Sequence, residues 1–239
     1  MNPLDIAAFE AARATVLGRI ADACAAAGRD PTAVTLVAIS KTVPPERLQA
    51  AVAAGLTTLG ENRVQEAADK VPVLAGVTWH LVGPLQSNKA RRAIELFDVI
   101  QSVDSVGLGQ RLDRLVDEVR PGASLPVLLQ VNVDDDPAKA GFEVGELSAA
   151  VDALAACPSL ELRGLMTIGR LTTDPDDARG TFRRLREVSE RLRTGGSTLG
   201  PELSMGMSDD YALAVEEGAT IVRVGRALLG ERRPVDGAG

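Results

Sequence analysis

The sequence predicts a single α/β barrel of the (β/α)8, or TIM, type with an extra helix at its N-terminus. Three observations support this fold class. Eight short apolar runs have the length of strands, they alternate with amphipathic stretches typical of helices, and several runs are apolar on both faces, as parallel strands covered by helices are. An open doubly wound sheet fits the same alternation, but the number of strands favours a closed barrel.

The elements are predicted in order along the chain. A first helix covers roughly residues 3–28, because Ile6, Phe9, Val16 and Ile20 recur at helical spacing. The predicted strands cover 34–40, 57–60, 78–82, 99–102, 126–131, 161–166, 201–205 and 221–224. The predicted helices between them cover 45–54, 62–74, 87–96, 105–119, 144–156, 175–193 and 209–218.

The last stretch, residues 227–239, is too short and too rich in Gly and Pro for a regular eighth helix. We therefore expect the N-terminal helix to cover the side of the barrel that an eighth helix would leave bare. Loops are predicted at 134–138 and 172–177, but no linker, repeat or shift in composition divides the chain. The expectation is one domain over residues 1–239.

The composition limits the classes of partner that the protein is expected to bind. A net charge of -7 disfavours broad binding to nucleic acid or to an anionic membrane, which leaves a small polar ligand as the favoured partner. The N-terminus lacks the pattern of a signal peptide and no apolar stretch is long enough to span a membrane, so a cytoplasmic location is expected. Cys24 and Cys157 lack the spacing of a zinc site, so we expect two reduced, buried thiols and no metal.

Candidate reactive groups are few, since only four of the 26 Lys and Arg residues are lysines and the chain has a single His and a single Tyr. Lys41 directly follows the first predicted strand, at the end of the barrel where active sites form. An amine among apolar residues is desolvated, which disfavours its charged form and leaves the lone pair available to an aldehyde. The sequence thus predicts a Schiff-base lysine, with an ordinary surface lysine as the alternative.

The ends of the seventh and eighth strands have the features of an anion site. Arg223 and Gly225 end the eighth strand, where barrels often hold a phosphate and where glycine lets backbone N–H groups approach an anion. Ser208 is interpreted as the N-cap of the following helix, as a phosphate ligand, or as both. Gly206, between two methionines, indicates close approach of the backbone to a flat ligand.

Two further polar residues fall near the predicted mouth. Asn62 either caps the helix after the second strand, which the sequence favours, or points an amide into the mouth. His80 lies within the third strand, where a single histidine is more often a hydrogen-bonded core residue than a catalyst.

Six blocks, in the same order, resemble the pyridoxal phosphate homeostasis protein family, and the resemblance spans nearly the whole chain. The blocks are AISK at 38–41, GENRVQE at 60–66, WHLVGPLQSNK at 79–89, GLM at 164–166, SMGMSDD at 204–210 and RVG at 223–225. This resemblance implies a barrel like the N-terminal domain of alanine racemase, with pyridoxal 5′-phosphate, a vitamin B6 cofactor, held covalently as an aldimine on Lys41. It also implies that Arg223 faces the pyridine nitrogen, where a permanent cation disfavours protonation of the ring and weakens it as an electron sink.

The resemblance also implies which residues bind the phosphate of the cofactor. Ser208 and the backbone at Gly225 and Arg226 match the phosphate cup, with Ser204 and Gly206 adjoining it. Many family members have Thr or Ser where this chain has Arg226, which can still offer its backbone N–H and its guanidinium to the phosphate. Three further positions match residues that line the cofactor: Asn62, His80 and Met166.

Three functions remain open at this point. The first is a non-catalytic carrier that shields the cofactor and delivers it to apo-enzymes that use it, acting as a monomer. The second is an amino-acid racemase or related enzyme, which needs a second proton donor opposite the lysine. Tyr211 is the only tyrosine, and its place just inside a helix indicates packing, which favours the carrier. The third is a class I aldolase that uses Lys41 without a cofactor.

Overall fold

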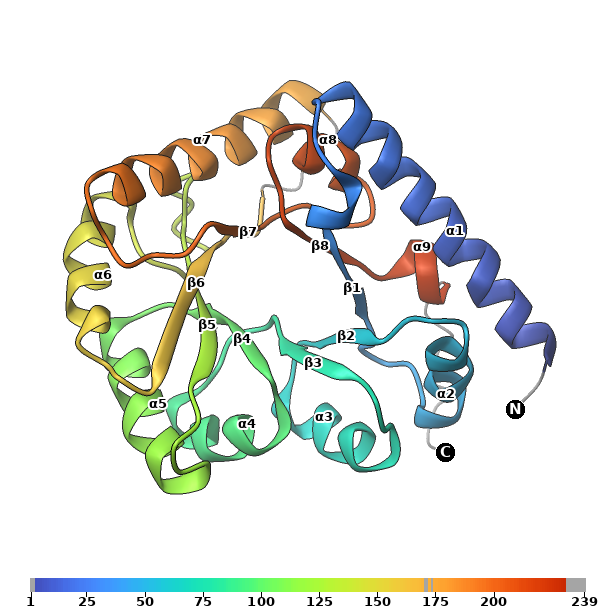
Figure 1. The fold of residues 1–239 in the computed structure, drawn as a ribbon, viewed down its shortest axis with the longest axis horizontal. Coiled ribbons are helices and arrows are strands. Elements are labelled where there is room, and N and C mark those ends of the chain that lie inside the picture. The colour runs from blue at the N-terminus through green and yellow to red at the C-terminus, as the bar shows by residue number, and fades with distance from the viewer. Residues whose placement is uncertain (1–2, 170–171, 173, 231–239) are drawn as a thin grey trace.

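The computed structural model describes residues 3–169, 172 and 174–230. Its strands form a closed barrel in which each strand pairs in parallel with the next along the chain and the last pairs with the first (Figure 1). The strands are β1 (Thr35–Ile39), β2 (Thr58–Glu61), β3 (Thr78–Leu81), β4 (Val99–Val103), β5 (Leu125–Gln130), β6 (Leu160–Met166), β7 (Glu202–Ser204) and β8 (Ile221–Val224). The predicted barrel and its eight strands are confirmed.

Helices surround the strands on the outside of the barrel (Figure 1). They are α1 (Pro3–Ala26), α2 (Pro45–Ala53), α3 (Val64–Lys70), α4 (Ala90–Leu96), α5 (Val106–Val119), α6 (Leu147–Ala155), α7 (Pro175–Thr194), α8 (Tyr211–Glu216) and α9 (Arg226–Leu229). The helix predicted over 62–74 is shorter than expected, because α3 gives way to a 3-10 turn at Val71–Val73. Pro72 lies in that turn, and its ring and missing N–H do not allow the α-helix to continue.

The N-terminal helix closes the ring of helices. Within the described residues only the four-residue α9 follows β8, so no full helix covers that part of the barrel. α1 packs against α8, α2 and α9 along the gap (Figure 1). Phe9, Val16 and Ile20 of α1 are buried in this contact. The expectation that the first helix replaces the eighth is confirmed.

The barrel interior changes from apolar to polar along the strands. A small inner cluster holds five buried side chains: Val37, Val99, Leu128, Met166 and Ile221. Two residues beyond Val99 and Ile221, on the same face because side chains alternate along a strand, come the buried polar residues Gln101 and Arg223. The larger apolar core lies between the sheet and the helices, and it includes both cysteines, which are free and buried as predicted.

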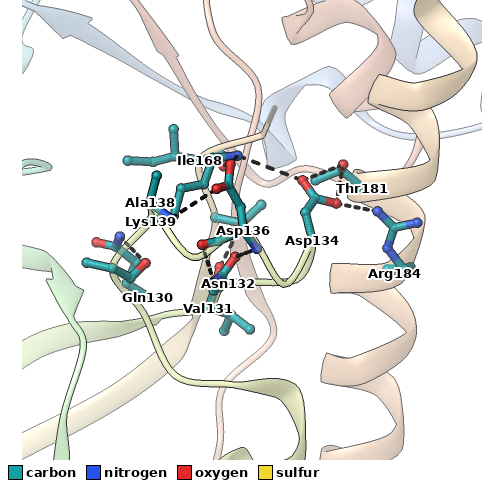
Figure 2. A network of polar contacts seen from close by, with 12 residues as sticks. Gln130, Val131, Asn132, Asp134, Asp136, Ala138, Lys139, Ile168, Thr181 and Arg184 are labelled. Atoms are coloured by element: carbon teal, nitrogen blue, oxygen red, sulfur yellow. Dashed lines mark hydrogen bonds and ion pairs between the residues drawn. The ribbon is translucent and has the colours of Figure 1, made fainter. Parts of the chain in front are cut away.

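The loop after β5 is held in place by polar contacts (Figure 2). Asp134 is buried, accepts a hydrogen bond of 2.8 Å from the Thr181 hydroxyl, and pairs with Arg184, so the loop is attached to α7. Lys139 in the same loop donates to the carbonyl of Ile168 after β6. The loop predicted at 172–177 is shorter than expected because α7 starts at Pro175, with Asp174 as its N-cap; residue 173 lies outside the described residues.

No helix in the described ranges combines the length and the apolar character that crossing a bilayer requires.

Candidate functional site

Lys41 lies in a tight turn directly after β1. The turn is closed by a 3.0 Å hydrogen bond from the Val43 N–H to the Ser40 carbonyl. Thr42 has a φ of +65°, a left-handed conformation that is costly for a β-branched residue, and its N–H donates to the Glu66 carboxylate. The Lys41 side chain is half-buried, less enclosed than the sequence suggested, and its amine has no hydrogen bond or ion pair with any described residue.

A buried ion pair supports the residue before Lys41. The Lys70 ammonium contacts the Glu61 carboxylate and donates a 2.8 Å hydrogen bond to the Ser40 carbonyl. The Ser40 hydroxyl also donates to Glu61, at 2.8 Å. All three residues are buried, and burial raises the pKa of the Glu61 carboxyl while Lys70 opposes that rise. The cluster fixes the backbone from which Lys41 extends.

Arg223 is buried inside the barrel, on the strand next to Lys41. β8 pairs with β1, with Arg223 opposite Val37. The guanidinium donates at 2.6 Å to the Ser204 hydroxyl and at 2.7 Å to the Thr167 carbonyl, and both acceptors are neutral. It forms no ion pair within the described part of the chain. Burial lowers the pKa of Arg223 to about 10, so the group keeps its positive charge at neutral pH.

From Arg223 a chain of hydrogen bonds crosses the barrel interior. The Ser204 hydroxyl donates at 2.6 Å to the Gln101 side-chain oxygen, and the Gln101 side-chain nitrogen lies 2.7 Å from Nδ1 of His80. All four side chains are buried. Burial, with a smaller contribution from the charge of Arg163, lowers the pKa of His80 to about 4, so this imidazole is neutral at pH 7.

Ser208 and Gly225 meet at the ends of β7 and β8. The Gly225 N–H donates a 3.1 Å hydrogen bond to the Ser208 hydroxyl. The prediction that Ser208 caps the following helix is wrong: a turn intervenes, and α8 begins at Tyr211 with Asp210 as its N-cap. An ideal Cβ at Gly225 would lie 3.6 Å from Cβ of Ile39, which places Gly225 close to the end of β1 and hence to the Lys41 turn.

Arg226 and Ala227 begin α9, where backbone N–H groups lack acceptors within the helix. These N–H groups follow Gly225, which bonds to Ser208, and the group of donors is called the cradle below. N–H groups of this kind could hold an anion. The Arg226 guanidinium is exposed and pairs with the exposed Asp209 carboxylate, so the backbone of Arg226 rather than its side chain is free at the cradle.

The other predicted site residues are placed as follows. Gly206 has a φ of +88°, and its carbonyl accepts the Arg223 N–H at 3.1 Å. Met166 lies in the inner apolar cluster, paired with Ser204 across β6 and β7. Asn62 does not cap the helix after β2 as predicted, because Arg63 is the N-cap, and the Asn62 N–H points back to the Glu61 carboxylate.

The structure thus brings together Arg223, Ser204 and His80 in the interior, and Ser208, Gly225 and Arg226 at the rim. Ser204, which by resemblance adjoins the phosphate cup, bonds to Arg223 and Gln101 of the interior group. Four residues that complete these groups are not among those predicted from the sequence: Glu61, Lys70, Gln101 and Thr167. The scarcity of lysine could have drawn attention to Lys70, which is one of only four in the chain. Its ion pair with Glu61, at the end of the preceding strand, becomes visible only in the folded structure.

The closed parallel barrel of eight strands gives the class of protein. This is the class of the alanine racemase N-terminal domain, a family that matches residues 23–233. The chain belongs to the pyridoxal phosphate homeostasis protein family. It is 45% identical to the protein of that name from Pseudomonas aeruginosa over 92% of this chain and 94% of the relative. It is 38% identical to the one from Escherichia coli K12 over 92% and 94%.

Solved structures agree. PipY of Synechococcus elongatus, solved with PLP bound, is 42% identical and has a TM-score of 0.78, with 88% of this chain and all of that chain covered. An alanine racemase from Clostridium difficile is 15% identical with a TM-score of 0.69, and its match covers 92% of this chain but 55% of that chain. The latter likeness shows that the barrel is shared and nothing more.

Proposed function

We propose that this protein binds pyridoxal 5′-phosphate at the carboxyl ends of β1, β7 and β8 and serves in cofactor homeostasis, as a carrier that delivers the cofactor to apo-enzymes. One observation supports this above the others. Among the described residues the Lys41 amine has no hydrogen-bond or ion-pair partner, and Arg223, buried on the adjacent strand, forms no direct ion pair, although the charge of Asp210 acts on it from farther away. Aldehyde, pyridine ring and phosphate are the three groups of this cofactor, and the site offers a partner for each.

The partners divide as follows. The Lys41 amine attacks the aldehyde carbon, and loss of one water leaves the imine, or internal aldimine. The phosphate binds at the Ser208 hydroxyl, which accepts from the Gly225 N–H and keeps its own hydrogen to donate. The N–H groups of Arg226 and Ala227 at the start of α9 complete the cradle. Arg223 faces the ring nitrogen with guanidinium hydrogens that Ser204 and Thr167 do not use.

The same residues favour storage over catalysis. A guanidinium opposite the ring nitrogen disfavours protonation of that nitrogen, so the ring is a weaker electron sink for carbanion chemistry. Tyr211, the only tyrosine of the chain, is 2% exposed and packs in the core, so it is not placed to act as the second proton donor of a racemase. The relatives named for pyridoxal phosphate homeostasis, and PipY with PLP bound, support the cofactor. A monomeric state in the cytoplasm belongs to the same proposal.

Absorption spectroscopy tests the attachment. The purified chain incubated with pyridoxal 5′-phosphate should show a new band at the violet edge of the visible range, resistant to gel filtration and absent in Lys41→Ala. Lys89→Ala is the matched control and should retain the band. A wild-type chain that stays colourless would overturn the proposal and favour the cofactor-free aldolase.

Assays of the loaded protein separate carrier from enzyme. We expect no rapid interconversion of D- and L-amino acids, together with restoration of activity to an apo-enzyme that needs the cofactor. Rapid racemisation would refute the carrier function while leaving cofactor binding intact.

A further inference from the structure

The chain Arg223–Ser204–Gln101–His80 has a fixed direction. Arginine carries only hydrogen-bond donors, so the Ser204 oxygen must accept from it. The single hydroxyl hydrogen of Ser204 then goes to Gln101, whose carbonyl oxygen must face Ser204. The NH2 group of Gln101 is therefore the end that faces His80, 2.7 Å away.

This direction decides where His80 carries its proton. A donor from Gln101 at 2.7 Å requires that Nδ1 of His80 accept, with its lone pair. The single hydrogen of the neutral ring is then on Nε2, which has no hydrogen-bond partner among the described residues. His80 is in this way a donor at Nε2, and its one lone pair is occupied inside the protein.

We infer that Gln101 is a positioning residue that fixes His80 as a neutral Nε2–H donor and so withdraws the only histidine of the chain from proton transfer at the barrel mouth. A general base needs an unprotonated nitrogen that faces its substrate, and His80 has none to offer. The functional importance of this tautomer rests on the proposed function. If the cofactor binds here, a His80 that cannot accept a proton is one more reason for weak acid-base catalysis at the site.

Protonation of His80 is opposed from several sides. A hydrogen on Nδ1 would point at the NH2 group of Gln101, and two donors that face each other repel and form no hydrogen bond. Rotating the Gln101 amide would remove that conflict but would leave the Ser204 hydroxyl without its acceptor inside the barrel, where an unmet polar group is costly. The positive charge of Arg163 acts in the same direction, and burial lowers the pKa of the ring to about 4.

Nitrogen NMR of the untagged chain tests the inference. Because His80 is the only histidine, every imidazole signal of a sample labelled with 15N-histidine belongs to it. At pH 7 and without cofactor, we expect the wild type to show a protonated Nε2 and an unprotonated Nδ1. The opposite tautomer, or an even mixture of the two, would overturn the inference without any variant being made.

Two variants and one control extend the test. In Gln101→Glu the carboxylate accepts from both neighbours, so the proton should move to Nδ1 and the pKa of His80 should rise by roughly one unit or more. In Gln101→Leu the preference for Nε2 should be lost. Gln130→Leu is the matched control: Gln130 is also a buried barrel glutamine, but it donates to the Ala140 carbonyl, so this variant should leave the His80 signals unchanged.

An unchanged tautomer in both Gln101 variants would contradict the positioning role, because packing alone would then set the ring. The result of this NMR test does not depend on whether the proposed function is correct. If pyridoxal 5′-phosphate gives no absorption band with the wild type, the proposed function fails, whereas the nitrogen signals of the cofactor-free chain still decide the role of Gln101.

Discussion

Two cations are buried near the mouth of this barrel, and their surroundings differ. The Lys70 ammonium contacts the Glu61 carboxylate. Among the described residues, the Arg223 guanidinium donates to the neutral oxygens of Ser204 and Thr167 and to no carboxylate. Lys70 lies behind the Lys41 turn, and Arg223 lies on the neighbouring strand β8.

Under the proposed function, the difference separates a charge that supports the fold from a charge that is left for a ligand. A buried ion needs compensation, and Glu61 supplies it to Lys70 within the fold. Arg223 has no carboxylate in direct contact among the described residues, and the charge of Asp210 acts on it only from farther away. Such departures from local rules are typical of binding sites, where the missing partner is the ligand.

The largest expected effect comes from breaking the compensated pair. Lys70→Met leaves the Glu61 carboxylate buried without a counter-ion and should lower the free energy of unfolding by about 3–5 kcal/mol. Urea unfolding measures this loss. The double variant Glu61→Gln/Lys70→Met removes both charges and should recover most of it. A single variant that costs less than about 1 kcal/mol would show that the pair is solvated.

The Arg223 side of the mouth should make stability depend on pH through His80. The folded pKa of about 4 lies below the ordinary 6.5, so between these values the unfolded chain binds a proton that the folded chain does not. This contribution is complete above pH 6.5 and is lost as the pH falls to 4, with a magnitude on the order of 3 kcal/mol. Urea unfolding at a series of pH values checks it, and the slope should flatten over this range in His80→Gln. An equal slope in that variant would assign the effect to other groups.

Removing Arg223, which has no direct ion pair among the described residues, should cost less stability than removing Lys70, which has one. Arg223→Met deprives the Thr167 carbonyl and the Ser204 hydroxyl of one donor each, a loss of about 1–3 kcal/mol. Its main effect should be on the ligand, with weaker retention of pyridoxal 5′-phosphate in a spectroscopic titration. If Arg223→Met destabilises as much as Lys70→Met and binds the cofactor normally, the contrast between the two cations is wrong.

The smallest expected effect on stability is at the rim. Arg226→Ala removes an exposed ion pair with Asp209, worth less than about 1 kcal/mol, and should leave phosphate binding unchanged. Arg226→Pro removes the backbone N–H as well, at the first helical position, where proline is tolerated. Weaker binding of pyridoxal 5′-phosphate in the Pro variant alone would assign the contact to the backbone, and equal binding in both would exclude that contact.

The strands could be predicted because their signal is local. Apolar runs and turn residues mark each strand within a residue or two, and the eighth strand is predicted with the bounds that the structure has. The closed barrel could be predicted because eight strands alternate with helices. The position of α1 over the last part of the barrel could be predicted because residues 227–239 are too few to form a full eighth helix.

The side-chain pairings could not be predicted, because they join distant parts of the sequence. Ser204 and Gln101 are 103 residues apart and meet only when the barrel closes. A local pattern predicts Ser208 as a helix cap, as a phosphate ligand or as both, and the cap is the part that the structure contradicts. The turn that follows, in which the Met207 N–H donates to the Asp210 carboxylate, moves the start of the helix and leaves Ser208 to Gly225.

The pairing of β8 with β1 has a consequence for synthesis of the protein. Lys41 follows the first strand of the barrel, whereas Arg223 and Gly225 are on or just after the last. On the ribosome Lys41 emerges early, and the rest of the site is complete only after nearly the entire barrel has been translated. Cofactor capture by this geometry therefore requires the completed barrel, so a nascent or truncated chain that lacks β8 should not trap a reactive aldehyde in the proposed way.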